Sequence, residues 1–191
     1  LMLDTVKIFS KKKIYLDLGH VGIFKKLANL AGLNKENVKT IKEIIKNKSS
    51  SEIKNYMNSL NVDTNLRDCI CDFPKMHGPI ENILLNSNNL IAFNKEIEND
   101  IKYMMKLCSL INANHSDVEI KYDFCELQGF DYENGILLST YIENDSHEVA
   151  IGGNYNFQPE EISGIGFSVD VRYLLKNQNT FNISNISGKW I

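Results

Sequence analysis

The hydrophobic pattern of this chain changes its period near residue 117, and this change limits the fold class more than any other feature. Before it, most apolar residues recur at the 3.6-residue spacing of amphipathic helices. After it, they alternate with polar residues, as in half-buried strands. Helices and strands that are segregated along the sequence indicate an α+β fold, and 191 residues are enough for one full-sized core.

A strand, a turn and a helix open the recognisable part of the chain. Apolar and polar residues alternate over residues 14–18, and Gly19 and His20 then interrupt the alternation. Apolar residues at helical spacing follow until Gly32, which is a typical residue just after a helix. We expect His20 to cap this helix, because no neighbouring residue completes a catalytic pair with it.

Residues 34–60 have the pattern of short amphipathic helices. Asn34 is a typical N-cap, and Ser49 followed by Glu52 has the spacing of a capping box. Each helix has one apolar face, so together they predict a small helical insertion. We place this insertion at residues 34–88, within a single domain that covers residues 1–191.

A proline-rich loop is expected at residues 71–79, and one long helix at residues 90–111. The rest of the sequence predicts four successive strands with short turns, and therefore an antiparallel sheet flanked by helices. These strands are expected near residues 118–127, 135–142, 148–157 and 164–171, with a short helix after the last.

The charge and the cysteines exclude several classes of protein. A net charge of −3 is unlike the basic surface of most nucleic-acid-binding domains. No apolar run reaches the length of a membrane span, and the start lacks the features of a secretory signal, so we expect a cytoplasmic protein. Because the chain begins with Leu1 and not with methionine, we expect it to be a fragment or a trimmed chain. The spacing of Cys69 and Cys71 is too short for a zinc site, so free thiols are expected and no metal.

Four ordered segments resemble the class II histidyl-tRNA synthetase-like family, and most closely its branch of ATP phosphoribosyltransferase regulatory subunits. The likeness extends from about residue 14 to residue 175. The segments are LDLGHVGIFKKLANLAGL (16–33), ELQGFDYENGILLSTY (126–141), VAIGGNY (149–155) and GIGFSVDV (164–171).

The resemblance implies a histidine-sized pocket on the sheet. The family's Arg-Gly-Leu-Asp-Tyr-Tyr-Thr-Gly segment is matched by residues 128–135, and its Gly-Gly-Arg-Tyr-Asp segment by residues 152–156. The ligand-binding residues implied in this way are Gln128, Gly129, Phe130, Tyr132, Glu133, Gly152, Gly153 and Tyr155.

Simpler explanations exist for several of these positions. The paired glycines Gly152 and Gly153 also fit a close approach of two strands, whatever else they do. Tyr132 and Tyr155 also fit the aromatic positions of an ordinary sheet. Asp131 is better explained by fixing the turn through its backbone than by catalysis.

Two departures from the family pattern concern the chemistry on ATP. Synthetases offset the charge that builds on the α-phosphate with arginines and magnesium. Gln128 stands at the first position where the resemblance implies an arginine. Tyr173 stands at the second such position, when the segments are aligned on Gly166 and Phe167. Arg172 is one residue out of register, which is about 100° of rotation on a helix.

The resemblance therefore implies a non-catalytic subunit without catalytic residues or a cofactor. Its implied partner is the short catalytic ATP phosphoribosyltransferase subunit, its implied effector is histidine, and a homodimer or hetero-oligomer is expected. Two alternatives are a divergent fragment of a histidyl-tRNA synthetase and a decayed relative that serves only as an interaction module. Glu133, where the family has tyrosine, has the charge to offset the ammonium group of histidine.

Overall fold

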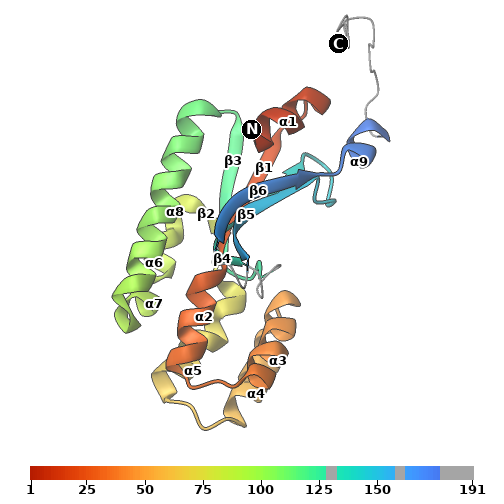
Figure 1. Cartoon of the computed structure of the whole chain (residues 1–191). Helices are drawn as coiled ribbons and strands as arrows, with labels where there is room; N and C mark the ends of the chain where they lie inside the picture. Colours follow the sequence, from red (N-terminus) through yellow and green to blue (C-terminus); the bar gives the residue numbers. More distant parts are fainter. Residues whose placement is uncertain (128–132, 158–161, 177–191) are drawn as a thin grey trace, which may run out of the picture.

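The computed structural model describes residues 1–127, 133–157 and 162–176, and within them one mixed sheet of six strands forms the centre of the fold (Figure 1). The strand order is β2-β3-β1-β4-β5-β6. The strands are β1 (Ile14–His20), β2 (His77–Pro79), β3 (Val118–Asp123), β4 (Glu133–Ile142), β5 (Ala150–Phe157) and β6 (Ile162–Val169). This arrangement confirms the α+β class.

The expected antiparallel arrangement holds for every neighbouring pair of strands except β1 and β3, which are parallel. A parallel pair requires a long crossover connection, and the helical segment between residues 21 and 117 supplies it. The four strands predicted after residue 117 are all present.

Most of the helices lie in two groups beside the sheet, and α1 and α9 lie apart from both groups (Figure 1). Helices α6, α7 and α8 lie beside β2 and β3, whereas α2, α3, α4 and α5 gather at the end of the sheet where β1 finishes. The helices are α1 (Met2–Phe9), α2 (Val21–Leu30), α3 (Lys35–Lys46), α4 (Ser50–Asn58), α5 (Thr64–Asp72), α6 (Ile83–Asn86), α7 (Asn88–Phe93), α8 (Lys95–Asn114) and α9 (Val171–Lys176). Two 3-10 turns, η1 (Phe73–Lys75) and η2 (Ile80–Asn82), flank β2. The boundary of the insertion at residues 34–88 stays a prediction.

The sheet has two faces of different character. On the face that we call the Leu16 face, Ile14, Leu16 and Leu18 are buried side chains of β1. Helix α6 reaches this face, because Asn86 Nδ2 donates a hydrogen bond of 2.6 Å to Tyr122 Oη of β3. The opposite face, which we call the Asp17 face, carries the alternate residues of β1, of which Tyr15 and Asp17 are only half-buried.

A row of aromatic rings joins the helices to the sheet. The ring centroids of Phe24 and Phe73 are 5.5 Å apart, those of Phe73 and Phe124 are 6.1 Å apart, and those of Phe124 and Tyr122 are 5.3 Å apart. These tilted pairs link α2, η1 and β3, and each such pair typically adds about 0.5–1.5 kcal/mol beyond the area that it buries.

Asn94 divides the helix that was predicted for residues 90–111, so that prediction was wrong at this residue. Asn94 has an extended backbone (φ −156°, ψ 124°), and its side chain accepts a hydrogen bond of 2.8 Å from the backbone N–H of Glu96. An asparagine side chain that caps a helix competes with continuation of the preceding helix. Helix α7 therefore ends at Phe93, and α8 begins at Lys95.

The predicted helix ends are only partly confirmed. Asn34 caps α3 by accepting a hydrogen bond of 2.8 Å from the N–H of Asn37, and Gly32 has the positive φ of 64° expected after α2. Ser49 occupies the N-cap position of α4, but its side chain accepts no capping hydrogen bond, so the expected capping box is absent there. The same is true of His20 at the start of α2.

The loop predicted for residues 71–79 contains a short strand. Strand β2 pairs with β3, with Gly78 opposite Tyr122. Pro79 ends this edge strand, where its lack of an N–H breaks no ladder. Helix α1 had no counterpart in the sequence-based prediction.

The four cysteines are free thiols, and Cys69, Cys108 and Cys125 are buried. Burial raises the pKa of the Cys125 thiol to about 12, and the nearby charge of Asp123 adds to this effect. Within residues 1–127, 133–157 and 162–176, no helix has the length and apolar character needed to cross a membrane.

His20 is a buried imidazole beside an ion pair. Its side chain is 6% exposed, its Nε2 atom is 3.8 Å from Asp100 Oδ1, and Lys26 Nζ is 2.5 Å from Asp100 Oδ2. Burial lowers the pKa of His20, Lys26 lowers it further, and the Asp100 carboxylate only partly offsets them. The imidazole is therefore neutral in the folded state at neutral pH.

We expect the free energy of unfolding to fall as the pH drops below about 6.5, because the unfolded state then binds a proton that folded His20 excludes. His20→Asn should flatten this dependence below about pH 6.5. Chemical denaturation at a series of pH values measures the effect, with exposed His77→Asn as the control. An unchanged slope in His20→Asn would contradict the assignment.

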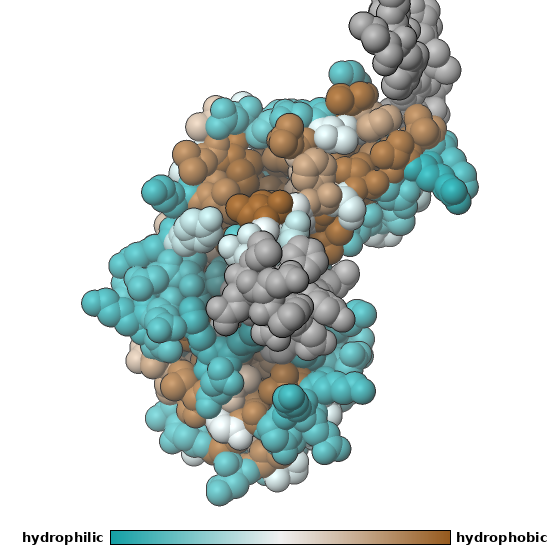
Figure 2. Space-filling view, in the orientation of Figure 1, coloured by the Kyte–Doolittle hydropathy of each residue, from teal (hydrophilic) through white to brown (hydrophobic). Residues whose placement is uncertain are grey.

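Strand β6 is an edge strand with apolar side chains on its surface. Among the described strands it pairs only with β5, and Ile165 and Phe167 are 81% and 43% exposed. Figure 2 shows apolar surface on the part of the molecule where α1, β6 and α9 lie. Such an edge is a template for pairing with another strand.

The chain should therefore self-associate at high concentration, and Ile165→Lys should weaken that association, because a lysine on an edge strand opposes pairing. Sedimentation velocity over a concentration series measures this. The same substitution at Leu110, an exposed position on α8, serves as the control. Equal association of both variants and the parent chain would contradict a role for the β6 edge.

Candidate functional site

The predicted pocket residues belong to β4, β5 and the segment before β4. Gln128, Gly129, Phe130 and Tyr132 lie outside the described residues, as does Asp131. Glu133 begins β4, and its backbone is paired with that of Tyr155 on β5. The structure therefore places the remaining members, Gly152, Gly153 and Tyr155, in detail, and the histidine pocket itself stays a prediction.

Gly152 and Gly153 allow β5 to approach both of its neighbours closely. A Cβ atom on Gly153 would lie 2.5 Å from the carbonyl oxygen of Ile136 on β4. A Cβ atom on Gly152 would lie 2.9 Å from Phe167 Cβ on β6 and 3.2 Å from Met2 Sδ on α1. The two glycines thus face opposite sides of the sheet, and the close approach of strands explains both of them.

Tyr155 is held against β6 on the same face as Gly153. Cβ atoms on Gly164 and Gly166 would lie 2.7 Å from Tyr155 Cε2 and 2.9 Å from Tyr155 Oη. The tyrosine ring therefore occupies the space that these two residues leave open. Gly164 and Gly166 belong to the GIG sequence of β6, and their lack of side chains leaves the surface on which this ring packs. In the sequence alone, this GIG stood out only as part of the resemblance.

Gly153→Ala should destabilise the protein by about 1–3 kcal/mol, because the added methyl group would overlap a backbone oxygen that has little freedom to move. Gly135→Ala is the matched control, since its Cβ atom would be 3.2 Å from the movable side chain of Asn154. Thermal and urea denaturation measure both variants. Equal destabilisation of the two would contradict the role given to Gly153.

Tyr173, which stands where the resemblance places a nucleotide-binding arginine, is fixed by neighbouring side chains. Its hydroxyl group donates to the Asp145 carboxylate at 2.7 Å, and its ring stacks on His147 with centroids 3.7 Å apart. Asp170 accepts a hydrogen bond of 2.9 Å from the N–H of Tyr173 and lies 3.2 Å from His147 Nε2. Arg172 is exposed on the same helix.

This cluster joins the start of α9 to the connection between β4 and β5. A hydrogen bond from the backbone N–H of His147 and another from the Tyr173 hydroxyl group lower the pKa of Asp145, which therefore accepts both as a carboxylate. The Tyr173 side chain thus holds α9 against the connection between β4 and β5.

Tyr173→Phe should lower the free energy of unfolding by about 1 kcal/mol, the usual value of a partly exposed hydrogen bond. Urea denaturation measures this loss, with Tyr103→Phe as the control, because Tyr103 is an exposed residue of α8. Full stability of Tyr173→Phe would mean that the hydroxyl group does not hold α9.

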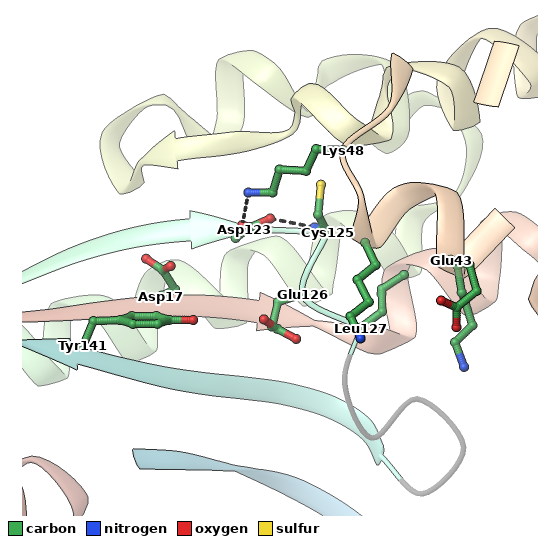
Figure 3. Close-up of a pocket in the computed structure, with 10 residues that line it drawn as sticks. Asp17, Glu43, Lys48, Asp123, Cys125, Glu126, Leu127 and Tyr141 are labelled. Carbon is green, nitrogen blue, oxygen red and sulfur yellow. Dashed lines mark hydrogen bonds and ion pairs between the residues drawn. The ribbon is translucent and has the colours of Figure 1, made fainter. Parts of the chain in front are cut away.

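A cavity of about 400 Å³ opens on the Asp17 face of the sheet, between β1, β4, the segment after β3 and the end of α3 (Figure 3). Asp17 comes from β1 and Tyr141 from β4, whereas Glu126 and Leu127 follow β3. Lys42, Glu43 and Lys46 of α3 line the other side. Sequence reasoning missed this cavity, although an acidic residue within the apolar strand LDL was a signal.

Lys48 closes one side of this cavity over β3. Its backbone has a positive φ of 51°, and its Nζ atom lies 2.7 Å from Asp123 Oδ2. Burial alone would lower the pKa of Lys48, but the hydrogen bond and charge of Asp123 raise it overall. Asp123 also accepts a hydrogen bond of 2.8 Å from the N–H of Cys125, so its carboxylate is well satisfied.

Asp17 differs from Asp123, because no hydrogen bond to its carboxylate is present among the described residues. Burial raises the pKa of Asp17, and the charge of Asp123 raises it further, against the weaker opposing effect of Lys121 and Lys48. An ionised Asp17 is therefore unfavourable in the folded chain without a further positive charge.

Asp17→Asn should raise the free energy of unfolding at pH 7. A raised pKa means that the folded state holds a proton more tightly, so ionisation of Asp17 costs stability as the pH rises above its ordinary value of 3.8. The advantage of the variant should shrink toward that pH.

The control is Asp117→Asn, because Lys7 lowers the pKa of Asp117 through a hydrogen bond and its loss should not stabilise the chain. Urea denaturation at several pH values compares the two variants. A lower stability of Asp17→Asn at pH 7 would contradict the account of Asp17.

Comparisons with known proteins give consistent results. A family model described as Histidyl-tRNA synthetase matches residues 1–174. The ATP phosphoribosyltransferase regulatory subunit of Hahella chejuensis is 27% identical over 180 residues, which cover 92% of this chain and 44% of that protein. The subunit of the same name from Teredinibacter turnerae is 24% identical over 184 residues, which cover 94% and 46%. The chain thus spans about half the length of the curated relatives that it matches.

Solved structures with low sequence identity share the fold. A Bacillus halodurans protein described as an ATP phosphoribosyltransferase regulatory subunit/histidyl-tRNA synthetase has a TM-score of 0.76 at 18% identity, over 94% of this chain and 48% of that one. A chain of the ATP phosphoribosyl transferase (HisG:HisZ) complex from Thermotoga maritima has a TM-score of 0.67 at 17% identity, over 88% and 57%. The histidyl-tRNA synthetase of Nostoc has a TM-score of 0.66 at 17% identity, over 91% and 44%.

Proposed function

The chain belongs to the histidyl-tRNA synthetase family, and we propose that it acts there as part of a non-catalytic regulatory subunit of ATP phosphoribosyltransferase. In this role it binds the short catalytic subunit, which joins ATP to phosphoribosyl pyrophosphate in the first step of histidine biosynthesis. It raises the activity of that subunit and takes part in feedback by histidine.

The observation that carries this proposal is the name shared by curated relatives over at least nine-tenths of this chain. The relatives from Hahella chejuensis, Teredinibacter turnerae and Marinobacter nauticus are all ATP phosphoribosyltransferase regulatory subunits. The Thermotoga maritima neighbour comes from a two-component HisG:HisZ complex of that transferase, which supports a catalytic partner.

The charges of the chain support a role without adenylation. Adenylate formation builds negative charge on phosphate oxygens, and removing one donor that stabilises such charge typically costs about 2.7–4 kcal/mol of barrier. Gln128 and Tyr173 stand at the two arginine positions that the resemblance implies, and Tyr173 is engaged with Asp145.

The two arginines of the chain, Arg67 and Arg172, lie elsewhere than at these two positions. Arg67 donates a hydrogen bond of 2.9 Å to the carbonyl oxygen of Val62 in the helical region. Arg172 lies on the exposed side of α9. Neither arginine stands at residue 128 or residue 173, the two positions where the resemblance implies an arginine.

Histidine is the proposed effector, and its site is the family pocket beside β4 and β5. Gly153 and Tyr155 lie on one face of β5, and Glu133 is paired by its backbone with Tyr155. The Glu133 carboxylate supplies charge for the ammonium group of histidine. Feedback then requires tighter binding of histidine to one state of the complex than to the other.

The test mixes this chain with a short catalytic ATP phosphoribosyltransferase subunit and measures phosphoribosyl-ATP formation. The rate should rise when the chain is added, and histidine should reduce it, because feedback requires histidine to bind one state of the complex more tightly than the other. Gly153→Ala, which disturbs the strand next to the pocket, should weaken the histidine effect.

Controls omit the chain, or replace it with bovine serum albumin at the same concentration. An unchanged rate in the presence of a stable complex would overturn activation and would favour a role as an interaction module only.

A further inference from the structure

A groove of about 690 Å³ lies between α2 and α3 in the helical region, and lysine is its most frequent residue. The residues that line it are Lys25, Ala28 and Asn29 of α2, Leu33 of the connection, and Lys35, Val38, Lys39, Lys42 and Glu43 of α3. Four lysines and one glutamate make this surface positive, whereas the whole chain has a net charge of −3. The groove is thus opposite in charge to the chain as a whole.

The lysines of α3 form a single stripe along the helix. They stand at positions 35, 39, 42 and 46, and at 100° per residue this spacing places all of them within about 60° of one another. From Lys35 to Lys46 the stripe follows about 17 Å of helix. Like charges three or four residues apart repel each other and oppose the helix that carries them.

Three of these lysines have charges that no carboxylate of the described chain offsets. Lys35, Lys39 and Lys46 are exposed, and none of them forms an ion pair within residues 1–127, 133–157 and 162–176. Lys26 and Lys48 differ, because an aspartate holds each of them. Carboxylates from another molecule would reduce the repulsion along α3, so the stripe favours an acidic partner.

The floor of the groove is apolar. Ala28 is buried, whereas Leu33 and Val38 are only partly buried, although both pack against the core. Both also line the groove, so they offer apolar contact between the lysines. A partner that covers this surface therefore needs apolar side chains beside its acidic ones.

We propose that the groove between α2 and α3 binds an acidic amphipathic helix of a partner protein. Its apolar side chains lie against Leu33 and Val38, and its carboxylates meet the lysine stripe, with Lys46 at the far end. A helix that lays one apolar face into a groove is a common form of peptide recognition, and complementary charges around the groove fix its direction and speed its association. This inference goes beyond the proposed regulatory function and does not depend on it.

A nucleic acid fits the groove less well than an acidic helix. None of the residues that line it is an arginine or an aromatic residue, and these are the residues that hold phosphates bidentately and stack on bases. The net charge of −3 also opposes a long polyanion, which extends beyond the groove. A short acidic helix contacts only the positive part of the surface.

The proposed ligand also differs from that of the predicted histidine pocket. The described members of that pocket, among them Glu133 and Tyr155, belong to β4 and β5 and do not line the groove. The groove meets the cavity on the Asp17 face only at Lys42 and Glu43, which line both. A protein segment across α2 and α3 is therefore a separate occupant from a small molecule on the sheet.

The test uses a fluorescein-labelled peptide of about 14 residues, long enough to follow the stripe as a helix. It consists of glutamate and leucine, with the leucines on one helical face. We expect saturable binding by fluorescence anisotropy, weakened by added salt because the charges lie at the surface. A control peptide of the same composition, with leucines on all sides of the helix, should bind about tenfold more weakly or not at all, because it cannot cover Leu33 and Val38 with one face.

The double variant Lys35→Glu/Lys39→Glu should lower the affinity about tenfold or more, because like charges then face each other. The matched control is Lys95→Glu/Lys106→Glu, the same change at two exposed lysines of α8, which should keep the parent affinity. Both variants should stay folded, since the first removes repulsion along α3, and circular dichroism checks this.

Three results would overturn the proposal. They are no saturable binding of the amphipathic peptide, equal binding of the two peptides, and equal loss of affinity in the two double variants. A labelled RNA duplex is the third ligand, and tighter binding of the duplex than of the peptide, lost in Lys35→Glu/Lys39→Glu, would replace the acidic helix with a nucleic acid. The catalytic subunit takes no part in these measurements, so their failure is distinguishable from failure of the proposed function.

Discussion

The close approach of β5 to β4 and β6 is the constraint on which the rest of the site depends. It is possible because Gly152 and Gly153 have no Cβ atoms. A Cβ atom on Gly153 would lie 2.5 Å from the carbonyl oxygen of Ile136 on β4. With β5 in this position, the Tyr155 ring lies over Gly164 and Gly166, and α1 packs through Met2 on the other face. The glycines thus set the spacing of three strands before any ligand is considered.

This chain differs at the end of the same sheet from the residue pattern that the resemblance implies. After β6 the chain enters α9 through Asp170, and Tyr173 turns back to Asp145 and His147. An arginine at this position would be available for a phosphate, but a tyrosine that bonds to a carboxylate is occupied. The fold is thus kept, while a position where the resemblance implies an arginine carries a tyrosine that links α9 to the connection between β4 and β5.

The sequence predicted the elements with strong periodicity and missed those that depend on partners. The four C-terminal strands and the N-cap at Asn34 followed from local patterns. The break at Asn94 was hidden because the apolar stripe continues from α7 into α8. Strand β2 was hidden because it exists only through pairing with β3, which lies far away in the sequence. The Asp17 cavity needed β1, β4 and α3 together, and no local pattern contains them.

The central claim is that this chain keeps the fold of its family without the adenylation chemistry. Histidine-dependent exchange between ATP and pyrophosphate tests it most directly, with an active histidyl-tRNA synthetase as the positive control. The account predicts no exchange above the rate without this chain, because the charges expected at residues 128 and 173 are missing. Exchange that depends on histidine and on this chain would contradict it.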